Sequence, residues 1–181
     1  MRSAFSRWIL NLLGWKIIVN FPDDLKKYVV AVVPHTSSWD FPLGLLVRSA
    51  IEKDIKFVGK HTLFKPPHGW IMKALGGVPV NRQKSGNFVK AVVDEYDRRE
   101  NFAICIAPEG TRKRVNKLKT GFYYIAKSSG AAIVLCKFDF ANKTVEFDKP
   151  FYPTDNQEAD FAYIDNYFSG VLGKRPEYSY K

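Results

Sequence analysis

The hydrophobic residues of this chain follow two different patterns. Residues 28–33 (YVVAVV) and 102–107 (FAICIA) are almost entirely apolar and do not alternate with polar positions. Strands of parallel sheets have this composition because helices cover both of their faces. Elsewhere apolar residues recur every three or four positions, which is typical of amphipathic helices. The alternation of the two patterns along the chain predicts an α/β fold.

We expect a single domain with a mostly parallel or mixed central sheet flanked by helices, because no repeat or linker divides the chain. Ser37 or Ser38 is expected to cap the helix after the first strand. The tail, residues 173–181, is expected to be mobile. Strands are predicted at residues 28–33, 55–58, 78–80, 102–107, 131–138 and 144–147, and helices at about 38–52, 68–75, 85–97, 120–129 and 157–172.

The N-terminal residues 1–19 are predicted to form an amphipathic helix, and residues 20–181 the main domain. Basic and polar residues interrupt the apolar run too often for a signal peptide or a membrane-spanning helix. Two interpretations stay open: the helix lies on an anionic membrane surface, or it packs against its own domain. The apolar stripe consists of Phe5, Trp8, Ile9, Leu12 and Leu13.

Composition narrows the possible partners. Hydrophobic residues make up 46% of the 181 residues, which argues against disorder, and the net charge of +10 favours an anionic partner. Cys105 and Cys136 lie inside apolar strand-like runs, so we expect two buried thiols in a reducing compartment. No base-reading motif accompanies the positive charge, and nucleic acid is therefore not an expected partner.

Polar residues with catalytic potential follow both buried strands. His35 comes directly after the first strand, and Asp40 lies about one helical turn further on. A histidine oriented by a carboxylate can act as a general base. Free amides at the start of the helix are expected to stabilise a developing oxyanion. An isolated pair with this spacing often occurs by chance, so the second loop matters.

The second loop, residues 108–112 (PEGTR), follows the strand at 102–107. Gly110 permits a tight turn, and Arg112 is suited to binding a phosphate or carboxylate. Glu109 either accepts a hydrogen bond from a substrate hydroxyl or pairs with Arg112. Four basic residues beyond the loop either meet anionic groups or are solvated: Lys113, Arg114, Lys117 and Lys119.

Together these segments resemble the glycerolipid acyltransferases of the 1-acyl-sn-glycerol-3-phosphate acyltransferase type. His35 and Asp40 match the family's H-x-x-x-x-D motif, residues 76–82 (GGVPVNR) its second motif, and residues 108–112 its third. The ordered match covers roughly residues 28–138. Pro34 and Pro79 depart from the usual residues, and residues 132–136 lack the proline of the fourth motif.

The resemblance implies transfer of a fatty acyl group from acyl-CoA or acyl carrier protein to the hydroxyl of a lysophospholipid such as 1-acyl-glycerol-3-phosphate. It implies His35 as base and Asp40 as its partner, with neither cofactor nor metal. A peripheral location on the cytoplasmic face of the inner membrane is expected. Residues that correspond to acceptor-binding positions are Lys60, Arg82, Glu109, Gly110, Thr111 and Arg112.

Three other functions remain possible on the sequence alone. The acceptor can be a different lipid, such as a lyso-aminolipid or an N-acyl amino acid. Water can be the acceptor, which would make the protein a thioesterase or esterase. The positive charge also fits a non-enzymatic protein that binds anionic membranes.

Overall fold

The structure, a computed structural model, describes residues 2–67, 69–80 and 88–180. In these residues seven strands form one sheet in the order β1-β7-β6-β2-β5-β3-β4, and only the β6–β7 pair is antiparallel. This confirms the predicted mixed sheet. The strands are β1 (Lys16–Val19), β2 (Lys27–Val33), β3 (Ile55–Lys60), β4 (Gly77–Val80), β5 (Phe102–Ile106), β6 (Ala132–Asp139) and β7 (Thr144–Phe147).

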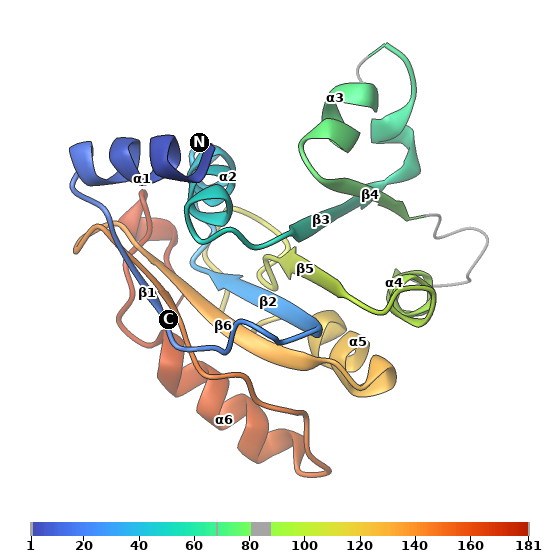
Figure 1. The fold of residues 1–181 in the computed structure, drawn as a ribbon. Coiled ribbons are helices and arrows are strands. Elements are labelled where there is room, and N and C mark those ends of the chain that lie inside the picture. Colours follow the sequence, from blue (N-terminus) through green and yellow to red (C-terminus); the bar gives the residue numbers. More distant parts are fainter. Residues whose placement is uncertain (1, 68, 81–87, 181) are drawn as a thin grey trace.

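Helices cover both faces of the sheet (Figure 1). On one face α1 and α2 pack over side chains such as Val30 and Val134, and on the other α4, α5 and α6 pack over Val29 and Ile133. Burial of both faces explains why β2 and β5 lack polar alternation. The helices are α1 (Arg2–Leu12), α2 (Asp40–Ala50), α3 (Gly69–Ala74), α4 (Phe88–Asp97), α5 (Gly121–Ser129) and α6 (Gln157–Phe168), with short 3₁₀ turns η1 (His61–Phe64) and η2 (Pro176–Tyr178).

The N-terminal helix is shorter than predicted. It ends at Leu12, and residues 16–19 form β1, which pairs with β7 at the edge of the sheet. Gly14 has a φ of 76°, a left-handed conformation that suits the end of a helix. The β-branched residues that follow favour a strand. The predicted boundary at residue 19 is therefore wrong, because β1 belongs to the main domain.

Helix α1 packs on its own domain and also leaves its apolar stripe in solvent. Ser6 Oγ donates to Ser49 Oγ on α2 at 2.9 Å, and Leu10 is buried against the same helix. Phe5 and Trp8, however, are 61% and 60% exposed. Packing against the domain and contact with a membrane are thus compatible. No helix in the part of the chain that the structure describes is long and apolar enough to cross a bilayer.

The C-terminal tail is ordered, contrary to expectation. Tyr180 is buried, and its hydroxyl donates to Asp165 on α6 at 2.6 Å. The backbone N–H of Gly173 donates to Ser179 Oγ, which closes the tail on itself. Helix α6 ends at Phe168, earlier than predicted, with Gly170 in the left-handed region. An aromatic side chain that reaches the core fixes this tail.

Candidate active site

The two polar loops lie side by side because the strands before them are neighbours. Strands β2 and β5 are parallel and adjacent in the sheet, with Ala31 opposite Ile106. Their carboxyl ends therefore lie at the same edge, where α/β sheets place ligand sites. The loop after β2 carries His35, and the loop after β5 carries Glu109.

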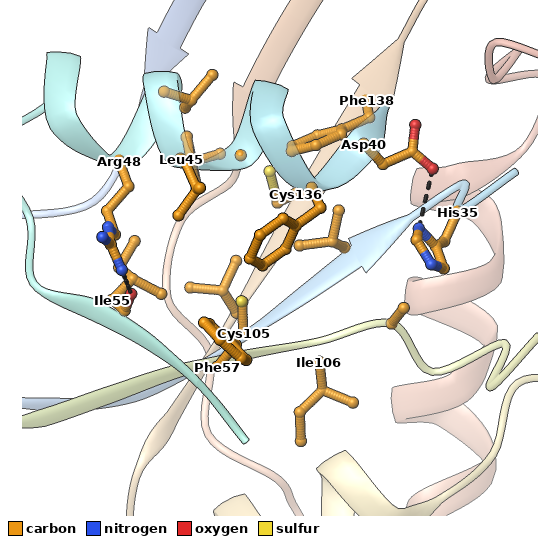
Figure 2. Close-up of a pocket in the computed structure, with 17 residues that line it drawn as sticks. His35, Asp40, Leu45, Arg48, Ile55, Phe57, Cys105, Ile106, Cys136 and Phe138 are labelled. Atoms are coloured by element: carbon orange, nitrogen blue, oxygen red, sulfur yellow. Dashed lines mark hydrogen bonds and ion pairs between the residues drawn. The ribbon is translucent and has the colours of Figure 1, made fainter. Parts of the chain in front are cut away.

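His35 and Asp40 are in direct contact, as their spacing predicted (Figure 2). His35 Nδ1 lies 2.9 Å from Asp40 Oδ2. The imidazole is partly exposed and the carboxylate is buried. Asp40 Oδ2 also accepts a hydrogen bond from the Ser37 backbone N–H at 2.9 Å, which fixes the carboxylate. This arrangement orients the ring and leaves Nε2 available for a proton.

The predicted serine cap and oxyanion site at the start of α2 are not found. Trp39 occupies the N-cap position and makes no side-chain cap. Ser37 Oγ instead accepts from the Trp39 N–H. The N–H groups of Asp40 and Phe41 donate to carbonyls within the loop. These amides are used to close a tight turn between His35 and Asp40, so they are not directed at a substrate.

Glu109 supports the loop that carries His35. Its side chain is buried and does not point to the solvent, where the predicted contact with a substrate hydroxyl would form. Its side chain is 2% exposed, and Oε2 accepts a hydrogen bond from the backbone N–H of His35 at 2.5 Å. Burial raises the pKa of Glu109 to about 7, partly offset by that hydrogen bond. Oε1 is buried and has no partner among the described residues. Glu109 thus fixes the backbone of the His35 loop.

Residues 110–112 of the second loop lie in solvent. Gly110 has a φ of 66°, which the turn requires and which other residues rarely adopt. Thr111 Oγ1 accepts from the Lys113 N–H within the loop. Arg112 is exposed, and its Nη1 lies 3.5 Å from Ser38 Oγ beside the histidine loop. The basic residues after it are also exposed: Lys113, Arg114, Lys117 and Lys119.

Of the other two residues predicted to bind the acceptor, Lys60 and Arg82, the structure describes only the backbone of Lys60. The backbone of Lys60 ends β3, paired with Val80 at the end of β4. Strand β3 is parallel to its neighbour β5, so Lys60 lies at the same carboxyl edge of the sheet as the His35 and Glu109 loops. Arg82 lies outside the described residues.

An apolar cavity opens next to His35, and no pattern in the sequence indicated it. The cavity lies between α2 and the sheet, is partly open to solvent, and has a volume of about 150 Å³. Ligand sites are typically concave and mostly apolar in this way. His35 and Asp40 line one end and Arg48 lines the other (Figure 2). The walls are apolar and include Val32, Leu45, Phe57, Ile106 and Phe138.

The two cysteines line this cavity but are unreactive. Burial raises the pKa of Cys105 to about 11 and that of Cys136 well above its usual value. A thiol with a raised pKa is a poor nucleophile at neutral pH. Cys136 is buried, as predicted, and Cys105 is only partly buried. The Arg48 guanidinium is satisfied by the carbonyls of Ile55 and Leu75, each at 3.0 Å.

Known proteins resemble this chain in sequence and in fold. A family model described as Acyltransferase matches residues 16–139. A 1-acyl-sn-glycerol-3-phosphate acyltransferase of Salmonella typhimurium is 28% identical over 142 residues, covering 73% of this chain and 56% of that protein. The human 1-acyl-sn-glycerol-3-phosphate acyltransferase beta is 31% identical over 137 residues, covering 72% of this chain and 49% of that protein.

A solved structure has the same fold. The crystal structure of a 1-acyl-sn-glycerophosphate acyltransferase from Thermotoga maritima superposes with a TM-score of 0.63 at 18% identity. The match covers 91% of this chain and 74% of that one. By contrast, the chain spans only about half the length of the curated relatives it matches.

Proposed function

This chain belongs to the acyltransferase family, and on that premise we propose that it transfers a fatty acyl group from a thioester to the hydroxyl of a lysophospholipid. One observation carries the proposal: the His35–Asp40 pair stands at the mouth of an apolar cavity. The base and a binding site for a hydrocarbon chain are thereby adjacent. The curated relatives are named for acylation of 1-acyl-sn-glycerol-3-phosphate, and we propose the same acceptor here.

In the proposed reaction His35 Nε2 removes the proton from the acceptor hydroxyl. The oxygen attacks the thioester carbonyl and forms a tetrahedral intermediate. When this intermediate collapses, the C–S bond breaks and the imidazolium returns the proton to the leaving thiolate. Asp40 holds the tautomer and stabilises the imidazolium. No acyl-enzyme forms, so the mechanism needs neither buried cysteine.

The acyl chain is proposed to lie in the cavity beneath α2. Burying each methylene of a hydrocarbon chain stabilises the bound state by about 0.8 kcal/mol. A chain that extends from the His35 end toward Arg48 places its carbonyl carbon at the catalytic pair. The donor carrier, acyl-CoA or acyl carrier protein, stays outside the cavity, beside the exposed basic loop of residues 113–119.

The acceptor is proposed to approach from the solvent side of the two loops. Arg112 is exposed next to Ser38 and is available to bind the acceptor phosphate. Arg82 and Lys60 are proposed to contribute as the family motifs imply. A lysine in place of Arg112 cannot form the paired hydrogen bonds of a guanidinium.

We also propose that the protein binds peripherally to an anionic membrane. Phe5, Trp8 and Leu12 present apolar surface on α1, and the chain carries a net charge of +10. Such a combination favours the interface between acyl chains and headgroups. The free thiols suit the reducing, cytoplasmic side of that membrane.

The test is acyl transfer from labelled acyl-CoA and acyl carrier protein to a panel of lysolipids, with products identified by mass spectrometry. The panel contains lysophosphatidic acid, a lyso-aminolipid and an N-acyl amino acid. We expect phosphatidic acid as the main product. Transfer only to the lyso-aminolipid or only to the N-acyl amino acid would show that this lipid, and not lysophosphatidic acid, is the acceptor. Release of free fatty acid without transfer to any lipid would identify a thioesterase.

A further inference from the structure

The C-terminal strap, which we define as residues 173–180, lies beyond the residues that the family model matches. Hydrogen bonds and burial hold the strap in one conformation. The N–H of Gly173 donates to Ser179 Oγ at 2.9 Å, and Ser179 is buried. Directly before the strap, the N–H of Phe140 donates to the Leu172 carbonyl at 2.8 Å. These bonds fix the strap against the end of β6.

The strap contacts the loop that carries His35. The backbone N–H of Arg175 donates to Thr36 Oγ1 at 3.1 Å, and Thr36 is buried. At Gly173 the approach is so close that a Cβ atom would lie 2.6 Å from Thr36 Oγ1 and 3.1 Å from Pro34. Only glycine fits such a gap without displacing the loop. The strap and the catalytic loop therefore hold each other in place.

This contact brings a cation beside the loop that carries His35. Lys174 Nζ lies 4.4 Å from the centroid of the Trp39 ring, which is 62% exposed. Arg112 reaches the adjacent residue, Ser38, from the opposite loop. Two basic side chains from distant parts of the sequence thus flank the segment formed by Ser38 and Trp39. This segment begins three residues after His35.

Neither cation forms an ion pair within the described part of the chain. Among the described residues, no ion pair includes Lys174 or Arg112. Their neighbours are an aromatic ring and a hydroxyl, neither of which carries a charge. Two uncompensated cations beside a catalytic site create a positive potential that attracts anions.

We propose that Lys174 is a substrate-binding residue, held by the C-terminal strap so that it and Arg112 together bind a phosphate group of a substrate. This proposal rests on the proposed function, because the phosphate is that of one of its two substrates. The phosphate belongs either to the lysophospholipid acceptor or to the carrier of the acyl donor. Both substrates carry a phosphate group, and binding experiments with each substrate alone distinguish between them.

The test measures binding without turnover. Titration calorimetry gives the Kd of lysophosphatidic acid in detergent micelles and, separately, of coenzyme A, for the wild type and Lys174→Ala. We expect Lys174→Ala to raise the Kd of one ligand roughly two- to fivefold at low salt, as for a partly exposed ion pair. Added salt should reduce the difference, and Lys174→Arg should restore most of the affinity.

Controls isolate the charge at this position. Lys149 is an exposed lysine near the opposite end of β6, so Lys149→Ala changes the net charge equally. Monoacylglycerol, which lacks the phosphate, should bind both variants equally. A higher Kd for lysophosphatidic acid assigns Lys174 to the acceptor, and a higher Kd for coenzyme A assigns it to the donor.

Equal Kd values in Lys174→Ala and Lys149→Ala for both ligands would overturn the inference. Because the measurement needs no catalysis, it separates the two proposals. A wild type that binds these ligands through Lys174 but transfers no acyl group would refute the proposed function alone.

Discussion

At the residue scale, Asp40 determines how His35 works. Its carboxylate contacts His35 Nδ1, so the proton of the ring is held on that nitrogen and Nε2 is free to accept another. Asp40→Asn keeps the shape and removes the charge. We expect kcat to fall roughly 10²–10⁴-fold while the apparent KM of the acceptor changes little. Steady-state kinetics with lysophosphatidic acid check this, and an unchanged kcat would remove Asp40 from the mechanism.

Glu109 makes stability depend on pH. Its pKa is about 7 in the folded protein against 4.5 as an ordinary value. Between these pH values the folded state keeps a proton that the unfolded state has released, so stability falls as pH rises from about 4.5 to 7. Glu109→Gln has no such proton. The free energy of unfolding of the wild type relative to Glu109→Gln should therefore fall by up to about 3 kcal/mol across this range.

Urea unfolding at pH 5 and pH 8 measures this difference. Glu158→Gln is the control, because Glu158 is exposed in the first turn of α6. The control should show no comparable change. If the wild type and Glu109→Gln lose stability in parallel with pH, the raised pKa is wrong.

The sequence predicted the contact between His35 and Asp40 because both residues belong to one short turn, where spacing determines distance. For Glu109 it predicted a contact with a substrate hydroxyl or with Arg112, whereas the structure places the carboxylate against the backbone N–H of His35. Whether a polar side chain after a strand turns inward depends on what lies beside it. Here that neighbour is the His35 backbone, 74 residues away in the sequence, and no local pattern encodes it.

At the scale of the elements, α2 forms one wall of the cavity. Gly44 lines the cavity, and a Cβ atom there would meet Phe138 at an ordinary 3.7 Å. Gly44→Leu therefore adds a side chain to the space proposed for the acyl chain. Overfilling a packed site costs about 1–3 kcal/mol. We expect long acyl donors to lose roughly tenfold in kcat/KM and short ones to lose little.

Competition between acyl donors of different length measures this preference. Gly121→Leu is the matched control, because a Cβ atom at Gly121 on α5 would meet nothing within 4 Å. An unchanged chain-length profile in Gly44→Leu would place the acyl chain elsewhere.

Helix α1 offers a test of membrane binding that leaves the fold intact. Deleting the helix would remove the buried Leu10 and expose α2, so point changes are better. Phe5→Ser combined with Trp8→Ser removes exposed apolar surface only. We expect several-fold weaker binding to anionic vesicles at unchanged thermal stability. Tyr152→Ser, at a similarly exposed residue, should bind like the wild type, and equal binding of all three would rule out docking through α1.

Element prediction succeeded where periodicity was strong and failed at the ends of the chain. Helix α4 and strands β2 and β5 follow from their apolar patterns. The first helix was extended too far because its apolar residues continue into β1, and only the left-handed Gly14 marks the change. The tail was expected to be mobile because its sequence is polar, yet one tyrosine buried against α6 holds it in place.

At the scale of the whole molecule, adjacent parallel strands bring the His35 loop and the Glu109 loop together, and α2 and the sheet enclose an apolar cavity beside them. The sequence indicated the α/β class, the mixed sheet and the histidine loop. It did not reveal the cavity, because the walls come from α2 and several strands, and each residue alone resembles ordinary core. The position of the C-terminal strap was hidden for the same reason.

The role of His35 as the base is tested most directly by one comparison. The rate at which phosphatidic acid forms from labelled acyl-CoA and lysophosphatidic acid is measured for the wild type and for His35→Ala. His35 lies at a loop, so the variant should fold with a similar melting temperature. We predict that the wild type forms the product and that His35→Ala forms it at least about 10²-fold more slowly. Near-equal rates in the two proteins would contradict the assignment of His35 as the base.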